Sequence, residues 1–235
     1  MRHYLGRRRH RNAPLPRLWE APQCADIISL AVRRHHQTRE RQANMLAQIT
    51  TPAKINLYLA VKGKREDGYH EIETLFLPVH ELTDTIRCQG MAEPGVAIVC
   101  NRPGVPTDQS NLVWRAAAAF AEASGVQPAW RFEIEKTIPV AAGLGGGSSD
   151  AAATLRLLNR MHDGPLGDDQ LGRIAARLGA DVPFFLTPTA AVGRGIGQQL
   201  SPVPVAHALP LVLINPGFPI PARWAYTKGW DRTQT

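Results

Sequence analysis

Cysteine is scarce in this sequence: the 235 residues contain three, Cys24, Cys88 and Cys100. Their odd number and irregular spacing argue against a disulfide framework or a metal site and favour reduced thiols in a cytoplasm. The chain also lacks a continuous apolar stretch of about 18 residues, so it predicts no membrane span. It contains no internal repeat.

Acidic residues are few in the first 44 positions, which hold ten arginines against three acids, a net charge of +7. The remaining residues carry 17 basic and 17 acidic side chains. A basic run can contact nucleic acid or a membrane surface, but this one has no regular apolar face and few aromatic residues. We interpret residues 1–44 as a solvated, largely disordered extension, and we expect neither a specific nucleic acid nor a membrane as partner.

A glycine-rich segment is the most informative feature of the chain. It comprises Pro139, Val140, Ala141, Ala142, Gly143, Leu144, Gly145, Gly146, Gly147, Ser148 and Ser149. A strand pattern precedes it and a helical pattern follows. Glycines let the backbone approach an anion closely, and the first turn of a helix offers unpaired N–H groups. The two serines add hydroxyls and a helix cap. The segment therefore predicts a phosphate-binding loop, with a glycine-rich structural turn as the alternative.

Two common nucleotide motifs are missing from this segment. No Gly-Lys-Ser/Thr closes it, so it is not a Walker A loop, and the spacing Gly-x-Gly-x-x-Gly is absent as well.

Hydrophobic periodicity gives a coarse secondary structure. Separate runs of strands and helices indicate an α+β fold rather than a doubly wound sheet. The pattern predicts strands at 46–50, 55–61, 71–79, 84–88, 96–100 and 130–136, helices at 111–124, 149–161 and 168–178, and further strands at 189–200 and 209–214. Pro183 is expected to break the helical pattern that ends near residue 178.

Residues 139–149 resemble the central motif of the GHMP family of small-molecule kinases, Pro-x-x-x-Gly-Leu-Gly followed by small residues and two serines. Two further matches follow the family's order along the chain. Pro-Ala-Lys-Ile-Asn-Leu-Tyr-Leu at 52–59, with Arg-Glu-Asp-Gly-Tyr-His at 65–70, resembles the opening of the branch that phosphorylates a cytidine-diphosphate-linked methylerythritol in the non-mevalonate isoprenoid pathway. Gly-Ala-Asp-Val-Pro-Phe-Phe at 179–185 matches the segment of the family's catalytic aspartate.

The resemblance implies a domain organisation. Residues 45–205 would form the N-terminal lobe of a GHMP kinase, a ribosomal-protein-like β/α sandwich, and 206–235 the start of a ferredoxin-like C-terminal lobe. The chain stops before the family's third glycine-rich motif. We therefore expect little or no turnover from this form and an exposed apolar surface near Leu211, Val212, Leu213 and Trp224.

The resemblance also bears on the origin of residues 1–44. Family members begin a few residues before the Pro-Ala-Lys motif, where Met45 lies, so translation from an upstream start codon is the favoured explanation. A plastid or mitochondrial transit peptide is the alternative, although the single serine, Ser29, and the acids argue against it. The expected location is the bacterial cytoplasm. His35 and His36 are interpreted as a coincidence of composition rather than a metal site.

The resemblance implies ATP and Mg²⁺ as cofactors and assigns two catalytic residues. Asp181 would accept the proton of the substrate hydroxyl, and Lys54 would stabilise the resulting anion and the developing charge. Lys54 is unusual by itself, because it interrupts an apolar strand pattern where a charge is costly unless paired. A solvent-facing lysine and a helix-end aspartate are the structural alternatives. Mg²⁺ would arrive with the phosphates of ATP and contact a loop serine, since the sequence contains no cluster of metal ligands.

Four residues are candidates for binding the acceptor. Asn56 can donate to and accept from a nucleobase edge, and Tyr69 and His70 offer flat rings for stacking, which suits a cytidine. By resemblance, Tyr226 fits a later aromatic position, although Ala222 stands where the family usually has a small hydroxyl residue. Residues 194–197 resemble the stretch after the catalytic aspartate and are expected to form a turn.

The expected partners are therefore ATP and a small cytidine-diphosphate-linked substrate, and a monomer and a homodimer both remain open. Two alternatives stay beside this interpretation. One is a GHMP kinase for a sugar, homoserine or mevalonate. The other is a nucleic-acid-binding protein that uses the basic extension, which the neutral charge of the remaining chain disfavours.

Overall fold

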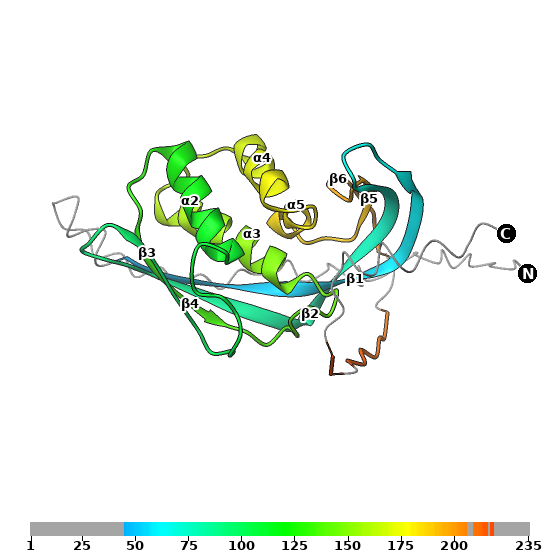
Figure 1. Cartoon of the computed structure of the whole chain (residues 1–235), viewed down its shortest axis with the longest axis horizontal. Coiled ribbons are helices and arrows are strands. Elements are labelled where there is room, and N and C mark those ends of the chain that lie inside the picture. Colours follow the sequence, from blue (N-terminus) through cyan, green and yellow to red (C-terminus); the bar gives the residue numbers. More distant parts are fainter. Residues whose placement is uncertain (1–44, 206–208, 216, 219–235) are drawn as a thin grey trace, which may run out of the picture.

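The computed structural model describes residues 45–205, 209–215 and 217–218. Within these residues one six-stranded mixed sheet carries helices on one face (Figure 1). The strands are β1 Leu46–Lys64, β2 His70–Gly90, β3 Gly95–Cys100, β4 Ala129–Glu135, β5 Ala191–Gly195 and β6 Gln199–Pro202, and the helices are α2 Leu112–Ser124, α3 Gly146–Met161, α4 Asp168–Leu178 and α5 Val182–Leu186. The predicted α+β class is confirmed.

The sheet has the strand order β3-β4-β2-β5-β6, with β1 paired to β2. All pairs are antiparallel except β3 with β4. Strand β4 shows why one face is covered: Trp130, Phe132 and Ile134 are buried, whereas Arg131 and Glu133 between them are exposed. This alternation is typical of a sheet with one packed and one solvated face.

The prediction of four strands between residues 46 and 88 was wrong, because β1 and β2 are two long continuous strands. A register shift replaces the expected breaks. Pro52 pairs with Thr83, but the next residue, Ala53, pairs with Val79. Proline has no N–H to donate to a ladder and is therefore tolerated in a sheet at such irregularities.

This register shift also changes which side chains of β1 face the helices. Before it, the odd-numbered residues Ala47, Ile49 and Thr51 are buried. After it, the even-numbered Lys54 is buried and bonds to Asn56, although Ala53 is buried as well and Tyr58 is exposed. Side chains alternate along a strand, and a bulge of this kind changes the face to which the next side chains point. Without the shift, strict alternation would place Lys54 on the face opposite to Thr51.

The helices α2, α3 and α4 confirm the predicted helices at 111–124, 149–161 and 168–178, although α3 begins three residues earlier, at Gly146. Helix α5 was not predicted. Pro183 is its second residue, where the missing N–H breaks no helical hydrogen bond.

The predicted strand at 189–200 is in fact a hairpin of β5 and β6. Gly195 and Gly197 adopt positive φ, and the Gly197 amide donates to the Arg194 carbonyl over 3.1 Å. The expected turn at 194–197 is confirmed.

The predicted strand at 209–214 was wrong, since the structure assigns no regular element there. Its side chains are exposed, including Leu211, Val212 and Leu213, as expected. Trp224 and Tyr226 lie outside the described residues. Among the helices that the structure describes, none has the length and apolar character needed to span a membrane.

Helix α3 is the central element of the helical layer and lies over the sheet (Figure 1). Ala151, Ala152 and Ala153 are fully buried, and their small side chains allow close packing. At its C-terminal end, His162 accepts a hydrogen bond of 3.2 Å from the indole of Trp130 on β4. The helix that follows the glycine-rich segment is therefore anchored in the core.

Candidate active site

The glycine-rich segment forms a loop that enters α3 through Gly145. This residue is the N-cap and has φ 72°, in the left-handed region that favours glycine. A Cβ atom here would lie 2.8 Å from Cζ of Phe185 and 3.0 Å from Cγ of Lys54. Gly145 therefore allows three segments that are distant in sequence to meet at one point.

The first turn of α3 presents backbone N–H groups next to this loop. Gly146, Gly147 and Ser148 are its first three residues, and the opening amides of a helix have no partner within the helix. Together with the positive end of the helix dipole they favour an anion. The predicted serine cap was wrong, since Gly145 is the N-cap and no side chain caps the helix.

The two loop serines have different surroundings. Ser149 is completely buried, and its hydroxyl donates to the Pro52 carbonyl over 2.6 Å. Because that uses its only proton, the Thr51 hydroxyl, also 2.6 Å away, must be the donor in the second bond. Ser149 therefore fastens α3 to β1. Ser148 is half-buried, and its Oγ lies 4.0 Å from the place of a Cβ on Gly179, two residues before Asp181.

Strand β1 holds the loop at a second point. The amide N–H of Lys54 donates to the carbonyl of Leu144 over 3.0 Å. Both attachments involve residues beside the register shift, where the regular ladder to β2 is interrupted.

The ammonium of Lys54 lies among three groups at this junction. It donates to Oδ1 of Asn56 over 2.7 Å and lies 3.4 Å from Oδ2 of Asp181. It also lies 5.4 Å from the ring centroid of Phe76, a distance suited to a cation–π contact. Lys54 is only 5% exposed, so the alternative of a solvent-facing lysine is excluded.

A chain of hydrogen bonds continues from Lys54 into the sheet. The amide nitrogen of Asn56 donates to the hydroxyl of Thr74 over 2.7 Å, and Thr74 donates to the carbonyl of Tyr58 over 2.7 Å. These bonds orient the Asn56 side chain with its oxygen toward Lys54. One N–H of the Asn56 amide is left over for a ligand.

Asp181 immediately precedes α5, but its side chain makes no capping hydrogen bond. The Asp181 carboxylate contacts Lys54 instead. The side chain of Asp181 is 32% exposed, whereas the side chain of Lys54 is 7% exposed. A ligand can therefore reach the carboxylate while the ammonium stays behind it.

The remaining predicted acceptor residues are not part of this cluster. Tyr69 and His70 lie at the far end of the β1–β2 hairpin, where Tyr69 is exposed. The hairpin end is ordered by the Arg65 amide, which donates to the Tyr69 carbonyl over 2.8 Å. Figure 1 shows this end curling up beside β5. Tyr226 lies outside the described residues.

Comparison with known proteins identifies the family. Residues 111–188 match the family described as GHMP kinases N terminal domain. The chain is 43% identical over 179 residues to the 4-diphosphocytidyl-2-C-methyl-D-erythritol kinase of Geobacter sp. strain M21, covering 76% of this chain and 64% of the relative. The enzyme of the same name from Nitratidesulfovibrio vulgaris is 41% identical over 184 residues, 78% of this chain and 64% of the relative. The chain belongs to the GHMP kinase family.

Solved structures agree with this assignment. A crystal structure of 4-(cytidine 5'-diphospho)-2C-methyl-D-erythritol kinase matches with a TM-score of 0.63 at 40% identity, over 76% of this chain and 63% of that one. Homoserine kinase from Cytophaga hutchinsonii matches with a TM-score of 0.56 at 18% identity, over 74% of this chain and 55% of that one, which shows the shared fold alone. This GHMP kinase chain spans about 64% of the length of its curated relatives.

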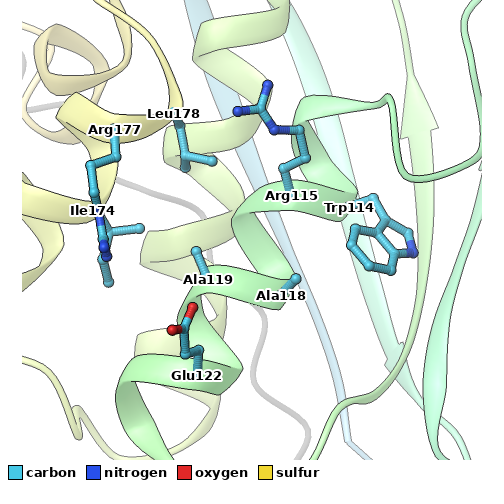
Figure 2. Close-up of a pocket in the computed structure, with 8 residues that line it drawn as sticks. All are labelled: Trp114, Arg115, Ala118, Ala119, Glu122, Ile174, Arg177 and Leu178. Carbon is cyan, nitrogen blue, oxygen red and sulfur yellow. The ribbon is translucent and has the colours of Figure 1, made fainter.

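A groove of about 300 Å³ lies elsewhere, between α2 and α4 (Figure 2). It is lined by Trp114, Arg115, Ala118, Ala119, Glu122, Ile174, Arg177 and Leu178. None of these belongs to the glycine-rich loop or contacts Lys54. The glycine-rich loop is the stronger candidate site, because the helix N-terminus, a buried cation and an accessible carboxylate meet there.

The sequence interpretation missed three charged residues behind the loop: Asp84, Lys136 and Asp150. All are buried. The sequence does contain a signal for Asp84. It lies two residues before Ile86 and four before Cys88 on β2, so its side chain points to the same buried face of the strand. A carboxylate at such a position must be paired.

Among the described residues, no group of three or more His, Cys, Asp or Glu side chains is placed to bind a metal ion. A GHMP site fits Mg²⁺ only as part of a metal–nucleotide unit, whose phosphates supply most of the oxygen ligands. Of the two loop serines, Ser148 faces this region and Ser149 is committed to β1.

Proposed function

We propose that this GHMP kinase chain binds ATP at the glycine-rich loop and transfers its γ-phosphoryl group to the 2-hydroxyl of 4-diphosphocytidyl-2-C-methyl-D-erythritol. The observation that carries the proposal is the Lys54–Asp181 pair beside the start of α3. Phosphoryl transfer requires positioning and charge neutralisation more than covalent chemistry. A cradle of amides, a cation and an accessible carboxylate are its minimum parts.

The two charged residues take different roles. Asp181 accepts the proton of the attacking hydroxyl, because its carboxylate is accessible and is not used as a helix cap. Lys54 holds that carboxylate and stabilises the negative charge that develops on the acceptor oxygen. Its burial prevents water from weakening this interaction.

The nucleotide phosphates would lie against residues 139–148. The amides of Gly146, Gly147 and Ser148 would bind them, and the Ser148 hydroxyl is the side chain best placed to help. Mg²⁺, when bound with ATP, neutralises phosphate charge. Ser149 acts in this proposal as a structural anchor rather than as a ligand.

The acceptor would lie between Asp181 and the hairpin end. The free N–H of Asn56 can donate to it, and Tyr69 and His70 can stack on a cytosine ring. Tyr226 is proposed as a second aromatic wall on resemblance alone. The choice of a cytidine-linked acceptor is supported by the relatives at about 40% identity, whose names specify it.

An acceptor panel tests the proposal. Mg·ATP binding is measured by calorimetry, and ADP formation is measured with the cytidine-linked acceptor, mevalonate, homoserine and galactose. We expect a Kd for Mg·ATP below about 1 mM, the upper end of usual KM values, and ADP formation stimulated by the cytidine-linked compound alone. No Mg·ATP binding at this concentration, or stimulation by a different acceptor, would overturn the proposal.

A further inference from the structure

A buried cluster of three charged side chains lies behind the glycine-rich loop. Asp84 comes from β2, Lys136 follows β4, and Asp150 is in the second turn of α3. Their exposed fractions are 0%, 8% and 4%. The Lys136 ammonium donates to Oδ2 of Asp84 and, over 2.7 Å, to Oδ2 of Asp150. One lysine thus joins the central strand of the sheet to the helix that the loop enters.

The same cluster contacts the chain on both sides of the loop. On the incoming side, Oδ1 of Asp84 accepts the amide N–H groups of Thr137 and Ile138 over 2.7 and 2.9 Å. At the end of the loop, where α3 begins, Nζ of Lys136 lies 3.0 Å from the position that a Cβ atom on Gly146 would occupy. These three side chains therefore connect the two ends of the loop to each other.

The charges of the cluster do not balance. Two carboxylates share one ammonium, and Oδ1 of Asp150 is buried without a hydrogen-bond partner among the described residues. Burial raises the pKa of Asp150 to about 7, although the charge of Lys136 opposes the rise. For Lys136, burial lowers the pKa, but the charges of Asp150 and Asp84 outweigh it and the net pKa is raised.

Buried ion pairs are often no more stabilising than apolar side chains of similar size, because desolvation offsets the attraction. An arrangement with an unpaired oxygen is less favourable still. Stability alone therefore does not account for this cluster, whereas fixing the geometry of the loop does.

We propose that Lys136 is a positioning residue of the nucleotide site, which bridges Asp84 and Asp150 and so holds the two ends of the glycine-rich loop at the spacing that directs the first amides of α3 toward phosphate. The inference rests on the proposed function. Lys136 acts through the backbone of the loop and needs no contact with the nucleotide. It should therefore affect nucleotide binding much more than acceptor binding.

The variant Lys136→Met tests this, with Lys62→Met as the matched control, because Lys62 is half exposed and pairs with Glu73 on the hairpin. Affinities for Mg·ATP and for the cytidine-linked acceptor are measured by calorimetry, and amide hydrogen exchange is followed over residues 137–150. We expect Lys136→Met to weaken Mg·ATP binding about 10- to 100-fold, the size of effect that misplaced groups produce. Acceptor affinity should stay within about threefold, loop amides should exchange faster, and Lys62→Met should change none of these.

Unchanged Mg·ATP affinity in a folded Lys136→Met protein would overturn the inference, as would equal weakening of both ligands. Should Lys136→Met fail to fold because two carboxylates are left unpaired, the triple variant Asp84→Asn, Lys136→Met, Asp150→Asn removes that penalty. The triple variant should fold and still bind Mg·ATP weakly; wild-type affinity in it would contradict the inference.

The exchange measurement separates this inference from the proposed function, because it needs no nucleotide. If the wild type binds no Mg·ATP, the proposed function fails. Faster exchange of the loop amides in Lys136→Met would then still support the positioning role, and unchanged exchange would reject it.

Discussion

The ammonium of Lys54 lies 3.4 Å from the carboxylate of Asp181, although the two residues come from a strand and from the start of a short helix far apart in the chain. The register shift after Pro52 turns Lys54 inward, and Gly145 leaves room for its side chain against Phe185. The pair thus depends on features of the backbone as much as on its own charges.

Lys54 and Asp181 should act as a unit in catalysis. We expect Lys54→Met and Asp181→Asn each to lower the rate of phosphoryl transfer by about 100-fold or more, within the range for lost acid–base and electrostatic assistance. The double variant should lose little beyond the worse single variant, because groups that act together are not additive. A double-mutant cycle on the rate measures this. Fully additive losses would show that the two residues act separately.

Gly145→Ala should damage the site more than Gly143→Ala. Both glycines have positive φ, near 72° and 74°, so both substitutions strain the backbone by about 1–2 kcal/mol. Only at Gly145 would the new Cβ also meet Phe185 at 2.8 Å, since nothing lies within 4 Å of the corresponding point at Gly143. Urea unfolding and Mg·ATP titration check this. Equal losses in the two variants would contradict the predicted contact.

Alanine substitutions at the two loop serines should have different effects, one on the stability of the fold and the other on nucleotide binding. Ser149→Ala leaves the Pro52 carbonyl without its hydroxyl donor in the core and leaves the Thr51 hydroxyl only its 3.4 Å bond to the carbonyl of residue 149. The loss should cost about 1–3 kcal/mol of unfolding free energy. Nucleotide affinity should change little. Ser148→Ala should do the reverse, weakening Mg·ATP binding with little loss of stability. Chemical denaturation measures the stability of both variants, and calorimetry measures their affinity for Mg·ATP. Weaker nucleotide binding by Ser149→Ala, or a large loss of stability in Ser148→Ala, would contradict the prediction.

Asp150 should make stability depend on pH. Its pKa in the folded protein, about 7, lies above its ordinary value of 3.8, so the folded state binds the proton more tightly than the unfolded state. The free energy of unfolding that it contributes is therefore present at low pH and is lost as the pH rises through about 7. Asp150→Asn removes this dependence. The unfolding free energy of the variant minus that of the wild type should therefore increase by on the order of 2 kcal/mol when the pH is raised from about 5 to about 8.

Urea unfolding of both proteins at the two pH values measures this gain. Lys136 and Asp84 face Asp150 in both proteins. Burial also lowers the pKa of His162, but that residue is present in both proteins and cancels in the comparison. A difference between wild type and variant that is independent of pH would contradict the prediction.

Local signals in the sequence predicted much of this domain. Periodicity located α2, α3, α4 and the strands β3 and β4, and the glycines and serines after β4 indicated the loop. Lys54 and Asp181 were paired by resemblance, and the structure brings them together. These features depend on short segments, whose preferences are expressed locally.

Features that depend on pairing between distant segments were not predicted. Separate strands were predicted at 46–50 and 55–61, whereas β1 continues through Pro52 with a register shift in its pairing with β2. Ser149 was expected to cap α3, but its burial against Thr51 follows from how α3 sits on β1. The cluster around Lys136 joins three elements and has no local motif. Such contacts are decided by tertiary packing, which overrides local preference.

The most direct test of the account is transfer of labelled γ-phosphate from Mg·ATP to 4-diphosphocytidyl-2-C-methyl-D-erythritol by the wild type and by Asp181→Asn, with Mg·ATP affinity measured in both. The label makes very slow transfer detectable. We predict that both proteins bind Mg·ATP equally well and that the wild type transfers the label about 100-fold faster or more. Detectable transfer at equal rates by the two proteins would contradict the account.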